Sequence, residues 1–182
     1  MVKTRISIIL GCMYSGKSTE LLRRASRYRS IGINTIIINS DKDTRTGLSV
    51  RTHAGKTVNA IKLTNLMSFT LSDEFHKCDV IAIDEAHFFS DLLKFVTYIE
   101  QFQKIIIISG LDGDYKRKPI GDILKLIPLC DDVVKLKALD MIDKDGSEAI
   151  FSKRIVESDE QILVGAQESY VAVSRKNYLK IR

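Results

Sequence analysis

The 182-residue chain has no tryptophan, only two prolines and three cysteines, and no long apolar run. Its longest purely aliphatic run, Ile105–Ile108, is far shorter than the roughly 20 residues that a membrane-spanning helix needs. No apolar segment of the secretory type fits before the first glycine, Gly11. The cysteines have no paired spacing, which argues against a disulfide framework and for a reducing compartment. We therefore expect a cytoplasmic protein without a membrane partner.

The composition is that of an ordinary globular protein, with 45% apolar and 28% charged residues. Its net charge of +5 is unevenly distributed, because residues 1–60 hold eleven Lys and Arg against three acids. Such an excess of positive charge is typical of proteins that bind nucleic acid. It suits equally well a domain that binds the phosphates of a small molecule, so the charge alone leaves both classes open.

The order of apolar and amphipathic segments predicts an α/β fold. Short isoleucine-rich segments alternate with segments of helical periodicity, a pattern typical of a mostly parallel sheet with helices on both faces. After about residue 138 the apolar segments become short, which favours a core of residues 1–137 and a small subdomain of residues 138–182. Strands are expected at 2–10, 33–39, 80–83, 104–109 and 133–136, helices at 17–30, 92–102 and 123–129, and a polar connection at 40–57.

The clearest motif is a phosphate-binding loop between the first expected strand and helix. Gly11–Ser18 reads G-C-M-Y-S-G-K-S and matches G-x-x-x-x-G-K-[ST]. In this loop backbone N–H groups and the start of the helix hold phosphate oxygens. In this motif Lys17 is expected to contact the β- and γ-phosphates of the nucleotide, and the Ser18 hydroxyl is expected to coordinate Mg²⁺. The residues expected to bind ATP are Gly11, Cys12, Met13, Tyr14, Ser15, Gly16, Lys17, Ser18 and Thr19.

A second motif places two acids after the apolar segment 80–83. Asp84 suits a contact to Mg²⁺, and Glu85 suits the removal of a proton from the group that attacks the γ-phosphate. Asp84–His87 also spells D-E-A-H, the box of a helicase class, and a P-loop ATPase acting on nucleic acid is therefore the alternative. Only 97 residues follow Glu85, however, and they contain no G-R-x-x-R pattern.

Taken together, the motifs resemble the type II thymidine kinases of cells and large DNA viruses, nearly from end to end. Met13–Leu21 resembles the family's M-F-S-G-K-S-T-E-L, and Asp43–Arg45 with Thr52–His53 resembles its D-T-R and T-H loop. Asp84–Phe89 resembles its D-E-A-Q-F-F, and Leu111–Pro119 resembles its L-D-G-x-F-x-R-K-P. Glu148–Arg154 with Tyr170 resembles its lasso segment.

This resemblance implies a RecA-like P-loop kinase that transfers the γ-phosphoryl group of ATP to the 5′-hydroxyl of thymidine, with deoxyuridine tolerated. It implies Glu85 as general base, Lys17 and Arg45 as catalytic cations, and Mg²⁺ held by Ser18 and Asp84. It also implies a homotetramer that has thymidine and ATP as partners and no nucleic acid. The substrate-binding residues carried over are Met13, Phe88, Tyr115, Ser152, Leu163 and Tyr170.

The chain departs from the family where the family holds a structural zinc ion with cysteine pairs. The matching positions are Asp140, Asp143, Ser174 and Asn177, which keep the spacing but supply no thiolate. Because structural zinc prefers cysteine sulfur or histidine nitrogen, we predict that this chain binds no zinc. Two aspartates and water holding a weak metal site are the alternative. Without the metal, the lasso subdomain is expected to be the least stable part of the chain.

Overall fold

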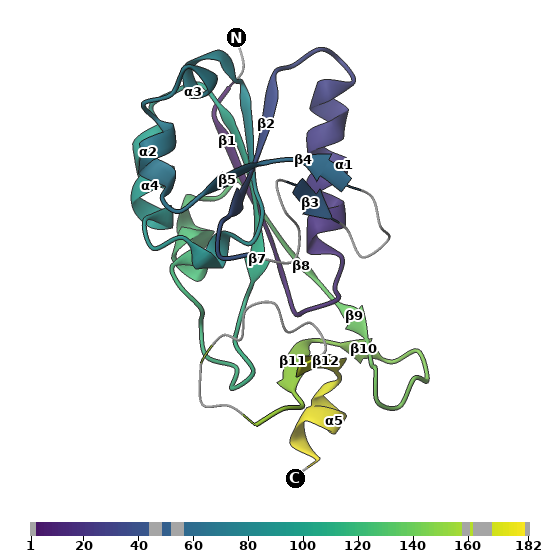
Figure 1. Cartoon of the computed structure of the whole chain (residues 1–182). Coiled ribbons are helices and arrows are strands. Elements are labelled where there is room, and N and C mark those ends of the chain that lie inside the picture. Colours follow the sequence, from purple (N-terminus) through teal and green to yellow (C-terminus); the bar gives the residue numbers. More distant parts are fainter. Residues whose placement is uncertain (1–2, 44–48, 52–56, 158–160, 162–168, 181–182) are drawn as a thin grey trace.

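The computed structural model describes residues 3–43, 49–51, 57–157, 161 and 169–180. Its centre is a six-stranded sheet in the order β5-β2-β6-β7-β1-β8, in which every strand pair is parallel (Figure 1). The predicted α/β fold with a mostly parallel sheet is therefore confirmed. In chain order the strands are β1 (Arg5–Gly11), β2 (Thr35–Ser40), β5 (Ile61–Leu63), β6 (Val80–Ile83), β7 (Ile105–Leu111) and β8 (Asp132–Leu136).

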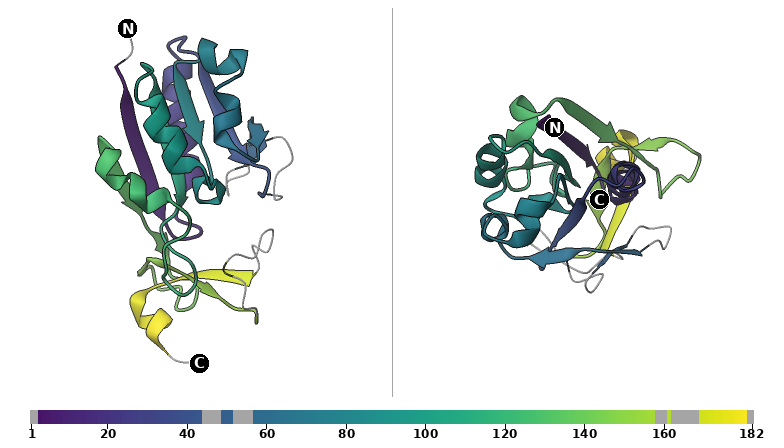
Figure 2. Two further views of the ribbon diagram at one scale, coloured as in Figure 1. Left: turned by 90° about the vertical axis from the view of Figure 1, so that its left-hand side faces the viewer. Right: turned by 90° about the horizontal axis from the view of Figure 1, so that it is seen from above.

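Helices cover both faces of this sheet (Figures 1 and 2). One face packs against α1 (Lys17–Arg29), which buries Leu21, Leu22 and Ala25. The other face packs against α4 (Leu92–Ile99) and several shorter helices. The inner strands, which are buried on both sides, are mainly apolar, and this explains the isoleucine-rich runs. The shorter helices are α2 (Leu66–Phe69), α3 (Asp73–Lys77), η1 (Ala86–Phe88) and η2 (Ile123–Leu129).

Three local features of the structure were not predicted from the sequence. The expected polar connection 40–57 contains β3 (Ser49–Arg51) and the start of β4 (Thr57–Asn59), which pair as an antiparallel hairpin. The edge strand β5 and the helices α2 and α3 have three to five residues each, too few to give a periodic pattern. The segment 123–129 forms a 3₁₀ helix, and Pro128 within it lacks the N–H group that an α-helical bond needs. Within the described ranges no helix is long and apolar enough to cross a membrane.

The C-terminal part forms two small antiparallel sheets beyond the carboxyl end of the central sheet (Figure 1). Its apolar core is small, since Ala138, Ala149 and Ala172 pack with Cys12 of the P-loop and the half-buried Tyr14. The first sheet pairs β9 (Ala138–Leu139) with β10 (Glu148–Ala149), the second pairs β11 (Phe151–Arg154) with β12 (Tyr170–Val173), and α5 (Arg175–Leu179) follows.

Candidate active site

The P-loop connects the end of β1 to the start of α1. Gly11 lies so close to β8 that a Cβ atom there would be 2.5 Å from the backbone oxygen of Leu136. Gly16 precedes the helix with φ of +84°, a left-handed conformation that glycine adopts without steric cost. Both glycines of the motif are therefore required by the backbone path, which wraps the loop around the start of the helix.

Lys17 folds back over this loop. Its buried Nζ donates a hydrogen bond of 2.6 Å to the backbone oxygen of Cys12, and Ser15 Oγ donates to the same oxygen at 2.8 Å. The ammonium group is thereby placed inside the loop, where phosphate oxygens of a nucleotide would lie. Thr19 is exposed in the first turn of α1.

Asp84 lies at the carboxyl end of β6 and is buried. The hydroxyl groups of Ser18 and Ser109 hydrogen-bond to its carboxylate. Burial and the neighbouring charge of Glu85 raise the pKa of Asp84 to about 6, although the two hydroxyl groups act in the opposite direction. The loop and β6 thus bring the two predicted magnesium ligands into contact.

A hydroxyl and a carboxylate oxygen side by side fit Mg²⁺, which keeps several waters and takes phosphate oxygens as further ligands. Across the part of the chain that the structure describes, no three His, Cys, Asp or Glu residues gather as a complete protein-only metal cage. The geometry therefore suits a cation that arrives with a nucleotide.

Glu85 has φ of +48° and ψ of +40°, the left-handed conformation that residues other than glycine seldom adopt. Such conformations cost about 1–3 kcal/mol and gather at functional sites. The Glu85 side chain is buried, with Oε2 3.6 Å from Nδ1 of His87. His87 Nδ1 in turn accepts a hydrogen bond of 3.2 Å from the backbone N–H of Leu111 at the end of β7. This histidine ties the Glu85 turn to the loop that carries Tyr115.

Two of the predicted nucleoside-binding residues, Tyr115 and Tyr170, are brought together by Arg154. The guanidinium carbon of Arg154 lies 3.7 Å from the centre of the Tyr115 ring, a cation–π contact. Its Nη2 and Nε also donate to the Tyr170 hydroxyl at 2.5 and 3.2 Å. Sequence reasoning missed Arg154 as a site residue, although the resemblance to the lasso segment included it.

Of the other described residues in this set, Met13 and Ser152 meet at the P-loop, whereas Phe88 lies beside His87. Ser152 Oγ accepts a hydrogen bond of 2.9 Å from the backbone N–H of Met13, so β11 contacts the P-loop directly. Tyr14 donates to the backbone oxygen of Tyr170 at 3.4 Å. Phe88 is half-buried, and its ring centre is 4.4 Å from that of His87. Arg45 and Leu163 lie outside the described residues.

The Tyr115 loop is also fixed to the C-terminal part of the chain. Tyr178 donates a hydrogen bond of 2.8 Å to the backbone oxygen of Tyr115. The guanidinium of Arg117 lies 4.6 Å from the centre of the Tyr178 ring. Gln161 donates to the Asp114 carboxylate at 3.1 Å. The basic turn at Arg117 thus contacts α5.

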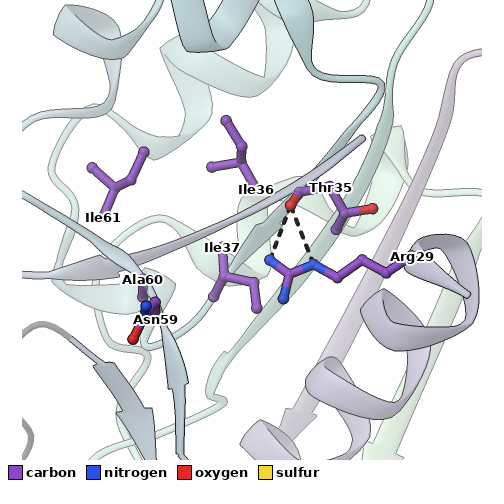
Figure 3. Close-up of a pocket in the computed structure, with 7 residues that line it drawn as sticks. All are labelled: Arg29, Thr35, Ile36, Ile37, Asn59, Ala60 and Ile61. Carbon is purple, nitrogen blue, oxygen red and sulfur yellow. Dashed lines mark hydrogen bonds between the residues drawn. The ribbon is translucent and has the colours of Figure 1, made fainter. Parts of the chain in front are cut away.

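A separate shallow pocket of about 210 Å³ lies beside β2 (Figure 3). Its lining mixes apolar and polar residues, and Arg29 donates two hydrogen bonds to the backbone oxygen of Thr35. None of the residues around it belongs to the predicted site. They are Arg29, Thr35, Ile36, Ile37, Asn59, Ala60 and Ile61.

A parallel sheet with a P-loop after β1 and a buried carboxylate against the P-loop serine defines a P-loop nucleotide-binding protein. The model of the thymidine kinase family matches residues 4–178, and the chain therefore belongs to this family.

Curated relatives agree with this assignment. The thymidine kinase of Yaba monkey tumor virus is 42% identical over 176 residues, covering 97% of this chain and 95% of the relative. That of sheeppox virus is 43% identical over 173 residues, covering 95% and 96%. That of vaccinia virus strain Western Reserve is 40% identical over 174 residues, covering 96% of each. The similarity thus spans nearly the whole chain.

Proposed function

We propose that this protein transfers the γ-phosphoryl group of ATP to the 5′-hydroxyl of thymidine, giving dTMP and ADP, and that it tolerates deoxyuridine. The observation that carries the proposal is the P-loop with Lys17 folded into it and Ser18 against Asp84, in a chain of the thymidine kinase family. An inactive member of the family is disfavoured, since Lys17, Ser18, Asp84 and Glu85 are all present.

In this proposal the phosphates of ATP bind to residues 11–19. Lys17 exchanges its hydrogen bond to the Cys12 carbonyl for phosphate oxygens, and Arg45 supplies further positive charge. Ser18 and Asp84 hold Mg²⁺, which neutralises charge on the phosphates when it is bound. These groups stabilise charge and align the γ-phosphate with the incoming oxygen, which is most of what catalysis of phosphoryl transfer requires.

Glu85 acts as the general base. As the 5′-oxygen bonds to the γ-phosphorus, the bond to the β-γ bridging oxygen breaks and ADP leaves. The hydroxyl proton passes to the Glu85 carboxylate, so charge and atoms balance.

The nucleoside would lie among Met13, Phe88, Tyr115 and Tyr170, with Ser152 and Leu163 completing the lasso side. The cluster of Tyr115, Arg154 and Tyr170 supports this, since aromatic side chains provide flat apolar walls for a base. Recognition of thymine by lasso backbone groups belongs to the same proposal, together with the division into core 1–137 and lasso subdomain 138–182. We further propose a cytoplasmic homotetramer that binds no nucleic acid.

A coupled assay of ADP release at saturating Mg·ATP tests this function. We expect thymidine to stimulate release most, deoxyuridine less, and single-stranded DNA not at all. A full nucleoside panel then defines the specificity. Stimulation by single-stranded DNA without stimulation by any nucleoside would contradict the proposal and favour a P-loop ATPase acting on nucleic acid.

A further inference from the structure

The four positions that match the family's zinc ligands come together in this chain around a single carboxylate. Oδ1 of Asp140 accepts hydrogen bonds from the backbone N–H groups of Ile142 and Asp143, at 2.8 and 3.0 Å. Its Oδ2 accepts from the backbone N–H of Ser174 at 2.7 Å and from the side-chain amide of Asn177 at 2.9 Å. Four N–H donors therefore converge on Asp140, which is buried.

This arrangement does not fit a zinc ion. Both oxygens of Asp140 already accept two N–H groups each, and Asn177 turns its N–H₂ group toward them, so hydrogens occupy the place of a cation. Oδ1 of Asn177 is buried without a hydrogen-bond partner among the described residues, but a neutral amide oxygen is a poor zinc ligand. The cluster is satisfied internally by hydrogen bonds.

The Asp140 cluster joins three segments that the small apolar core holds only weakly. Asp140 and Asp143 lie in the turn after β9, Ser174 follows β12, and Asn177 lies in α5. Ser174 also caps α5, since its hydroxyl accepts the N–H of Asn177 at 3.3 Å. The neighbouring core consists mainly of three alanines and a cysteine, which bury little apolar surface. Polar contacts must therefore supply much of the local order.

The cluster also connects to the candidate active site. Met141 N–H donates to the backbone oxygen of Ala172 at 2.9 Å, and Ala172 is paired with Ser152 across β12 and β11. Ser152 in turn contacts the P-loop at Met13, and Tyr170 begins β12. Two paired strands thus separate Asp140 from the phosphate-binding loop.

We propose that Asp140 is a positioning residue that takes over the task of the family's zinc ion, holding β12 and α5 against the turn after β9. By keeping β11 and β12 in place, it sets the positions of Ser152 and Tyr170 at the nucleoside site. The part of this inference that concerns the nucleoside rests on the proposed function, whereas the part that concerns local stability does not.

The test compares Asp140→Asn with Asp145→Asn in the full chain. Asparagine keeps the shape of Asp140 but replaces one acceptor oxygen by a donor and removes the charge. Asp145 is exposed in the same loop and accepts one backbone N–H, from Ser147 at 2.9 Å, so it is a matched control. For each protein we would measure hydrogen exchange without substrate and thermal unfolding with and without a zinc chelator. Elemental analysis and the KM for thymidine complete the comparison.

We expect no zinc in the purified protein and no effect of the chelator. In D140N, amide exchange in residues 139–143 and 170–178 should rise by at least about tenfold, while β1, β6 and β7 are unchanged. The KM for thymidine should rise while that for ATP is kept, and D145N should behave like the unaltered protein. If D140N does not fold, Asn177→Ala, which removes one donor, gives the same comparison.

One zinc ion per chain with chelator-sensitive unfolding would overturn the inference. So would equal exchange in D140N, N177A and D145N. If hydrogen exchange rises locally in D140N but the unaltered protein does not phosphorylate thymidine, the positioning role stands and the proposed function is refuted. The two failures are therefore distinguishable.

Discussion

Two adjacent carboxylates, Asp84 and Glu85, have different surroundings. Asp84 is held by the hydroxyls of Ser18 and Ser109, whereas Glu85 turns into a left-handed conformation beside His87. Asp84 is thus held against the P-loop serine and Glu85 lies beside His87, which suits Asp84 for binding a cation and Glu85 for accepting a proton. The cost is that two negative charges are buried together when no cation is bound.

Asp84→Asn should therefore stabilise the protein in the absence of nucleotide and Mg²⁺. The pKa of Asp84 is raised to about 6 in the folded protein from about 3.9 in the unfolded chain. The protonated carboxyl is therefore favoured by the fold, and the free energy of unfolding decreases as pH rises through this range and Asp84 ionises. At pH 8 we expect D84N to be more stable by about 1–3 kcal/mol, with the difference vanishing near pH 4. Urea unfolding in a chelator at both pH values measures this.

Asp122→Asn is the control, because Asp122 forms an i,i+3 pair with the exposed Lys125. Its stability should follow that of the unaltered protein at both pH values. A D84N protein that is less stable at pH 8 would show that the carboxylate is needed by the fold itself rather than by the bound cation.

Arg154→Met should weaken thymidine binding. Arg154 holds the Tyr115 ring and the Tyr170 hydroxyl in one cluster, and methionine keeps the aliphatic volume without the charge. Losing a cation–π contact and a hydrogen bond is worth roughly 1–2 kcal/mol, or about 5- to 30-fold in the KM for thymidine. Steady-state kinetics should show a much smaller change in the KM for ATP.

Arg175→Met provides the comparison, since Arg175 stacks on Phe151 with 5.0 Å to the ring centre but belongs to α5 outside the tyrosine cluster. Equal KM values for thymidine in both variants would mean that Arg154 does not organise the nucleoside site.

Among the elements, the sequence predicts best the mainly apolar strands inside the sheet and the amphipathic helix α1. β1, β6 and β7 are rich in isoleucine, and α1 shows helical spacing of its apolar residues from Lys17 onward. The short edge strand β5 has three half-buried residues and depends on pairing with β2 rather than on its own pattern. Tertiary contacts of this kind leave no periodic signal in the sequence.

The P-loop as an element depends on Gly11 for steric reasons. Gly11→Ala would place Cβ 2.5 Å from the Leu136 oxygen and 2.6 Å from Ser15 Oγ, forcing β8 and the loop apart. We expect the free energy of unfolding to fall by about 2–3 kcal/mol and ATP binding to be lost. Denaturant unfolding and nucleotide titration measure the two effects.

Gly32→Ala is the matched variant, because Gly32 has φ of +79° but no atom within 4 Å of a built Cβ. It should cost only the backbone strain, about 1 kcal/mol, and leave ATP binding intact. If G11A costs no more than G32A and binds ATP normally, the close packing of the loop on β8 is not essential.

In the whole molecule, the nucleotide-binding core meets the C-terminal part at the P-loop. Cys12 packs among alanines of the small sheets, Met13 donates to Ser152, and Tyr14 contacts Tyr170. From the sequence one could predict the P-loop, the two acids and the family motifs. The family motifs include the residues of the Asp140 cluster and Arg154, but the hydrogen bonds and ring contacts that these residues make could not be predicted, because they depend on tertiary packing between residues 16 to 39 positions apart in the sequence.

The most direct measurement of the central claim is the turnover of Glu85→Gln with thymidine and Mg·ATP. If Glu85 accepts the 5′-hydroxyl proton, kcat should fall by about 10²–10⁴-fold while calorimetry still detects binding of both substrates. The exposed Glu148, paired with Lys137, offers the control Glu148→Gln, which should keep full activity. Formation of dTMP by E85Q at the rate of the unaltered protein would contradict the role of Glu85 and the proposed mechanism with it.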